Sequence, residues 1–132
     1  MDLAFTMDAS DSMQQYITAA KNNIANIVNK VKQEFNESKV RVAFVAYRDW
    51  PDKAKHFEIL DFTENVDIFK KFVSQIQVST DRSSIDGAED VLGAIGRMID
   101  LNWNAANRVS FHIGNIDNQC IRYFHIRLIL YN

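Results

Sequence analysis

Short apolar runs mark four segments of the chain as strands. Residues 3–7, 40–47, 57–62 and 108–114 are rich in apolar, β-branched and aromatic side chains and are too short to be typical helices. The first run is apolar almost throughout, which is typical of a strand buried on both faces. Residues 57–62 alternate between apolar and polar side chains, as a half-buried strand does.

Three stretches between these strands carry apolar residues at the helical spacing of three and four. The first runs over about 13–36, the second follows Thr63, and the third runs over about 86–102. We expect Thr63 to cap the second helix. In the third helix, we expect Ala88, Val91, Leu92, Ile95 and Ile99 to face inward.

This alternation of strands and helices indicates an α/β fold. We expect one domain over residues 1–132, with a doubly wound, mostly parallel sheet, helices on both faces and right-handed crossovers. The loop that precedes residues 57–62 is too short for a crossover helix. That strand is therefore expected to pair antiparallel at one edge of the sheet.

The turn after the first strand, Asp8-Ala9-Ser10-Asp11-Ser12, carries the main candidate chemistry. Ligands of open α/β sheets bind outside the carboxyl ends of the strands. Asp8, Ser10 and Ser12 alternate along the turn, so a carboxylate and two hydroxyls can converge as hard oxygen ligands for Mg²⁺ or Mn²⁺. Alternatively, Ser10, Asp11 or Ser12 only caps the following helix, because all three are of favoured N-cap types.

The Asp-x-Ser-x-Ser pattern after an apolar strand resembles the metal-ion-dependent adhesion site of von Willebrand factor type A domains. Four further stretches resemble the alpha-kinase-associated branch of that family: KVRVAFVAYRD at 39–49, LDFT at 60–63, DGAEDVLGAI at 86–95, and NWNAANRV at 102–109. The resemblance covers about residues 2–115 and leaves 116–132 as a divergent tail. Because a complete type A domain continues with further strands and helices, the resemblance implies a C-terminally truncated form.

The resemblance also implies a function and further site residues. The expected function is a protein-binding module, not an enzyme, whose metal accepts a carboxylate from a partner protein. Asp86 matches an aspartate of the second metal-site loop, although residues 83–85 replace the glycines that precede it in the branch. Asn115 stands where the third loop usually has an aspartate, and Asp117 follows two residues later. Metal binding is expected to be weak, because an asparagine carbonyl carries no charge.

Composition excludes several other classes of partner and site. A formal charge of −2 argues against nucleic acid as the main partner. No apolar run reaches membrane-spanning length, and no signal peptide is visible. The single cysteine, Cys120, cannot form an internal disulfide, which fits a reducing compartment or a secreted type A domain that needs no bridge. Of the two, we expect a cytoplasmic location. The three histidines lack the paired spacing that is typical of zinc sites.

The tail carries a last strand pattern over residues 121–131, with one fully apolar face. We expect this strand to pair beside residues 109–113 and to cover that edge of the sheet. Its own outer edge would then stay exposed. An exposed apolar edge favours self-association, or a partner that supplies the missing layer.

Two other functions fit parts of the pattern. Asn115 and the replaced glycines also fit a scaffold whose metal site has decayed. The strand-end Asp8 also fits the phosphoaspartyl nucleophile of haloacid-dehalogenase-like phosphatases. Those enzymes need a second aspartate two residues later, where this chain has Ser10.

Overall fold

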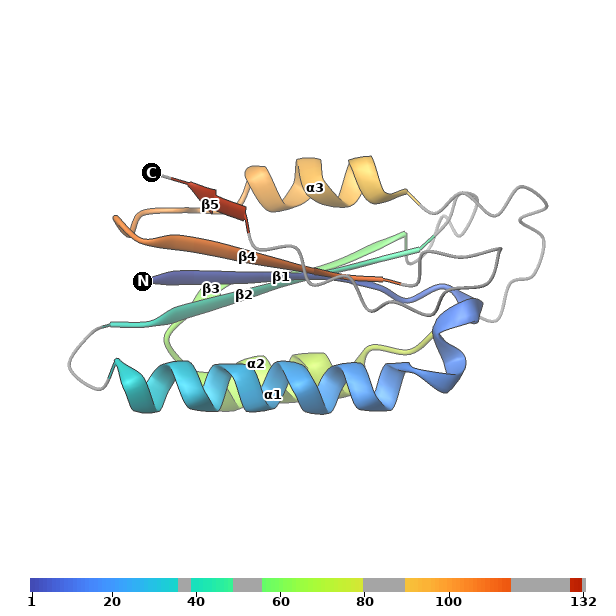
Figure 1. The fold of residues 1–132 in the computed structure, drawn as a ribbon. Coiled ribbons are helices and arrows are strands. Elements are labelled where there is room, and N and C mark those ends of the chain that lie inside the picture. The colour runs from blue at the N-terminus through green and yellow to red at the C-terminus, as the bar shows by residue number, and fades with distance from the viewer. Residues whose placement is uncertain (36–38, 49–55, 80–89, 115–128, 132) are drawn as a thin grey trace.

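The computed structural model describes residues 1–35, 39–48, 56–79, 90–114 and 129–131, which form a sheet with helices on both faces (Figure 1). The five strands lie in the order β3-β2-β1-β4-β5. Their bounds are β1 Asp2–Asp8, β2 Arg41–Tyr47, β3 Phe57–Thr63, β4 Arg108–Ile113 and β5 Ile129–Tyr131. The α/β fold expected from the sequence is confirmed.

The central strand β1 pairs in parallel with β2 on one side and with β4 on the other. β3 pairs antiparallel with β2, so the expected antiparallel edge is confirmed. β5 adds a second antiparallel strand at the opposite edge, where it pairs with residues 108–110 of β4. This is the edge expected for the tail strand, whose residues 121–128 lie outside the described part of the chain.

Two helices, α1 (Ile17–Glu34) and α2 (Val66–Gln75), cover one face of the sheet (Figure 1). A short 3-10 helix, η1 (Asp11–Gln15), leads from β1 into α1. The main core lies between these helices and the sheet, and includes Leu3, Phe5, Met7, Ile24, Val28, Phe44 and Phe69. Burial of each such large apolar side chain contributes about 1.5–3 kcal/mol. No helix within the described ranges is both long and apolar enough to cross a membrane.

The third helix, α3 (Val91–Ile99), covers the other face of the sheet (Figure 1). Its side chains Ala94 and Met98 are buried, and Met98 packs with Leu101 against the sheet residues Ala4, Ala43 and Val45. The prediction that Leu92 and Ile99 face inward is wrong, because these side chains are 83% and 57% exposed. Residues 94, 98 and 101 lie four and three positions apart and form the sheet-facing stripe, which turns Leu92 away from the sheet.

The structure also corrects two expected helix starts. Asn65, not Thr63, caps α2, since its side chain accepts hydrogen bonds from the backbone N–H groups of Asp67 and Ile68. Thr63 is still the last residue of β3. The third helix begins at Val91, not near residue 86. Asp90 caps it by accepting a hydrogen bond from the backbone N–H of Gly93 at 2.8 Å.

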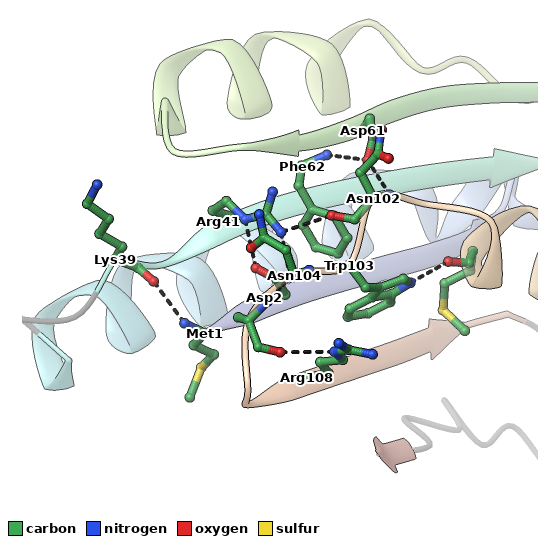
Figure 2. Close-up of polar contacts among 12 residues, drawn as sticks. Met1, Asp2, Lys39, Arg41, Asp61, Phe62, Asn102, Trp103, Asn104 and Arg108 are labelled. Carbon is green, nitrogen blue, oxygen red and sulfur yellow. Dashed lines mark hydrogen bonds and ion pairs between the residues drawn. The ribbon is translucent and has the colours of Figure 1, made fainter. Parts of the chain in front are cut away.

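A loop at the amino end of β1 ties α3 to the sheet (Figure 2). Asp61 of β3 accepts hydrogen bonds from the backbone N–H and the side-chain amide of Asn102. The indole N–H of Trp103 donates to the carbonyl oxygen of Met98 at 2.8 Å, and its ring packs on Phe62. Trp103 therefore packs the end of α3 against the sheet.

Candidate functional site

The turn after β1 is shaped by its first residue. Asp8 is the last residue of β1, faces Tyr47 of β2 in the register, and is only 1% exposed. Its Oδ1 accepts a hydrogen bond from the backbone N–H of Ser10 at 2.7 Å. A carboxylate that bonds the backbone two residues on forms a local turn. This turn directs the chain from the strand into η1.

The turn brings two hydroxyl groups together. Ser10 Oγ lies 3.0 Å from Ser12 Oγ. Ser10 is nearly buried, at 7% exposure, while Ser12 is exposed. Ser10 stands at the N-cap of η1 but makes no side-chain capping bond. Helix capping by the Ser10 side chain therefore does not account for the position of its hydroxyl.

These three side chains match the donor chemistry of a small hard cation. Mg²⁺ has near-octahedral geometry with ligands at 2.0–2.1 Å, so neighbouring oxygen ligands lie roughly 2.9 Å apart. The 3.0 Å between the two serine oxygens agrees with that spacing. Among the described residues, no three His, Cys, Asp or Glu side chains gather to hold a metal. A cation at this turn would therefore depend on hydroxyls and water as well as on Asp8.

The other predicted ligands, Asp86, Asn115 and Asp117, lie outside the described residues. The last described residues before these segments, Ser79 and Gly114, nevertheless lie close to the turn. The backbone N–H of Ser79 donates to the carbonyl oxygen of Ala9 at 2.8 Å, so the segment that leads to Asp86 starts beside the turn.

The segment that begins with Asn115 also starts close to the turn, because it follows Gly114. A Cβ added at Gly114 would lie 3.6 Å from Asp8 Cβ and 3.1 Å from Tyr47 Oη. The distance to Asp8 Cβ is an ordinary van der Waals contact, whereas the phenol of Tyr47 would have to shift slightly to make room for a Cβ. The end of β4 therefore lies directly beside the turn.

A partly buried polar network that sequence reasoning missed lies beside Asp8. Tyr47 Oη is 3.2 Å from His112 Nε2, and His112 Nδ1 is 2.8 Å from Thr6 Oγ1. The rings of Tyr47 and His112 stack with centroids 5.7 Å apart. Partial burial lowers the pKa of His112 below its ordinary value, which favours the neutral imidazole. The three residues come from three strands, and only the register reveals them as neighbours.

Arg48, directly after β2, holds the loop that follows α2. Its side chain is buried and donates from Nη2 to Glu58 Oε2 and to the carbonyl oxygen of Gln77, each at 2.5 Å. The observed partners connect β3 to the loop that reaches Ala9, so Arg48 helps to fix the surroundings of the turn.

Comparison with known proteins agrees with this fold. Residues 2–108 match the family model described as the von Willebrand factor A domain. The chain is also 27% identical over 116 residues to the alpha-protein kinase vwkA of Dictyostelium discoideum. This alignment covers 87% of the chain but 18% of that relative, so the chain spans less than a fifth of the relative's length. Because the family model matches most of its residues, the chain belongs to the von Willebrand factor A domain family, near its alpha-kinase-associated branch.

Proposed function

We propose that this chain is a protein-binding module in which Asp8, Ser10 and Ser12 hold Mg²⁺ or Mn²⁺. The family itself supports a protein-interaction module. The metal dependence is the finer part of the proposal. It rests on one observation, the 3.0 Å approach of the two serine hydroxyls in the turn that the buried carboxylate of Asp8 shapes.

The charge of this ligand set favours an acidic partner. One carboxylate and two neutral hydroxyls leave a divalent cation with a net positive charge, and Mg²⁺ usually keeps several waters. A carboxylate from a partner protein can replace one of these waters and gains a directional, charge-neutralising bond. Asp86 or Asp117 would add a second negative charge and weaken this attraction, whereas Asn115 would add a neutral oxygen.

A second candidate is a scaffold whose metal site has decayed. Asn115 and the non-glycine residues 83–85 favour it, because they depart from the family's pattern. In this case the bond between Asp8 and Ser10 would serve only to turn the chain. We propose no phosphatase activity, since Ser10 stands where a phosphoaspartyl phosphatase needs its second aspartate. We propose no kinase activity either, because the chain matches only 18% of the kinase relative.

Calorimetric titration of the chain with Mg²⁺ and Mn²⁺ tests the proposal. We expect weak uptake that Asp8→Ala removes. Asp8→Asn is the sharper variant, because its side-chain carbonyl can still accept the Ser10 N–H while the charge is lost. Asp67→Asn is the matched control, since it removes an exposed carboxylate in the first turn of α2.

The outcomes separate the two candidates. Uptake that is lost in both Asp8 variants and kept in Asp67→Asn supports the metal-dependent module. No uptake by the unchanged chain supports the decayed scaffold. Uptake that both Asp8 variants retain would contradict the proposal, because the ion would then bind elsewhere.

A further inference from the structure

A narrow groove of about 280 Å³ separates α1 from α2 on the outer side of the helical layer. Ile24, Phe69 and Val73 form part of its lining and belong to the buried core. Two lysines, Lys21 of α1 and Lys70 of α2, also line it. None of the described residues that line the groove is acidic.

Lys21 brings a partly buried positive charge to the groove. Its ammonium group donates to the carbonyl oxygens of Ser74, at 3.0 Å, and of Ile76. An ammonium has three N–H donors, so one remains after these two bonds. Burial lowers the pKa of Lys21, while Glu58 acts in the opposite direction. Because Glu58 already accepts an ion pair from Arg48, the charge of Lys21 is only partly compensated.

Lys70 adds a second positive charge. Its side chain is exposed and forms no ion pair with any residue in the described part of the chain. An acidic ligand therefore meets two cations and no acidic lining residue. This charge pattern, combined with an apolar base, fits a ligand that carries a carboxylate next to an apolar side chain.

The volume of the groove limits what it can hold. At about 280 Å³ it lies just below the range of typical small-molecule pockets, which begins at roughly 300 Å³. It can take one or two side chains of a larger partner. A groove between two helices is also a common docking place for an amphipathic segment, which inserts apolar anchors and leaves its polar face outside.

We propose that the groove between α1 and α2 binds an acidic amphipathic segment of a protein partner, with an apolar anchor between the helices and a carboxylate beside Lys21 and Lys70. This contact does not require a metal. Two of the lining residues, Thr18 and Lys21, lie in the first turns of α1. This end of α1 lies on the same side of the molecule as the end of β1 that carries Asp8 (Figure 1).

An NMR titration of the ¹⁵N-labelled 132-residue chain in EDTA tests the groove apart from any metal site. The probe is a synthetic helical peptide with leucines at positions i, i+3 and i+4 and glutamates between them. The control peptide has glutamine in place of each glutamate. We expect the acidic peptide to shift the signals of Phe69, Val73 and their neighbours, and the glutamine peptide to bind at least about fivefold more weakly.

Variants of the chain test the charge and the volume of the groove separately. Lys70→Glu should weaken the acidic peptide at least about fivefold, because it replaces an attraction with a repulsion. Lys30→Glu, on an exposed position of α1 that does not line the groove, is the matched charge control and should leave binding unchanged. Ala25→Leu should fill the groove and weaken both peptides.

Three results would overturn the proposal. The first is the absence of shifts at the groove with millimolar acidic peptide. The second is equal binding of the acidic and glutamine peptides. The third is an equal loss of binding in Lys70→Glu and Lys30→Glu, which would indicate attraction by the overall charge of the helical layer.

Discussion

Arg41 and Asp2 form a two-point ion pair between the neighbouring strands β2 and β1 (Figure 2), with Nε to Oδ1 at 2.8 Å and Nη2 to Oδ2 at 2.6 Å. The backbone N–H groups of Asn104 and Ala105 also donate to Asp2 Oδ2. Asp2 is fully buried, yet its carboxylate accepts four hydrogen bonds. Burial raises the pKa of Asp2, but Arg41 and the two amides outweigh it, so the pKa lies below its ordinary value.

Asp2→Ala should therefore strongly destabilise the fold. The change removes the carboxylate partner of the Arg41 guanidinium, which keeps the carbonyl oxygen of Asn102 as an acceptor, and it leaves two backbone N–H groups without their acceptor. Breaking a buried ion pair in this way costs about 3–5 kcal/mol. Urea unfolding followed by circular dichroism measures the change in the free energy of unfolding. Asp61→Ala, at a more exposed acceptor, should cost about 1 kcal/mol. Equal losses in the two variants would contradict the central role of Asp2.

The stability of the chain should fall as the pH drops below about 6.5, because partial burial lowers the pKa of His112 in the folded state. The pKa of His112 is lower in the folded chain than in the unfolded chain, so the unfolded chain binds more protons at pH values between the two. His112 therefore contributes to the free energy of unfolding above its unfolded pKa, and this contribution is lost as the pH falls towards its folded pKa. Urea unfolding at pH 5 to 8 should show this slope, and His112→Gln should flatten it. The same slope in His112→Gln would assign the effect to another group.

Asn115→Asp should tighten Mg²⁺ binding if the segment after Gly114 contributes a ligand, as the family resemblance implies. A second carboxylate adds a negative charge to a site with one carboxylate from the turn. Calorimetry of this variant, measured against Asn107→Asp as a control at the opposite end of β4, checks the expectation. An unchanged binding constant in Asn115→Asp would mean that residue 115 is not near the ion.

The tail should promote self-association of the isolated chain. β5 pairs antiparallel with β4 through residues 129–131 and forms the edge of the described sheet. An edge strand offers unpaired backbone groups to a second chain. Sedimentation velocity should show oligomers that increase with concentration, and Leu130→Lys should reduce them. A monomer at high concentration, with residues 121–131 protected from hydrogen exchange, would show instead that the tail completes the fold.

The sequence by itself determined the order of strands and helices, the antiparallel edge at β3, and the position of the Asp8 turn at the end of β1. These features depend on local periodicity and on loop length, which neighbouring residues encode directly. The Asp-x-Ser-x-Ser turn could be located for the same reason, since its residues lie within one stretch of five.

The local sequence pattern could not decide which residue caps α2 or which side of α3 faces the sheet. Thr63 and Asn65 are both good cap residues two positions apart, and only the end of β3 selects Asn65. The helix α3 is apolar on more than one side, so spacing alone could not tell whether Met98 or Ile99 faces the sheet. Contact with the small residues Ala4 and Ala43 decides this, and those residues lie on other strands.

Only the tertiary structure revealed the polar contacts between distant residues. Thr6 and His112 are 106 positions apart, and Asp2 and Ala105 are 103 apart. Such pairs depend on which strands are neighbours and on their register, and a shift of one residue would turn each side chain to the other face of the sheet. The sequence supplied the donors and acceptors, but the sheet order β3-β2-β1-β4-β5 determined which of them meet.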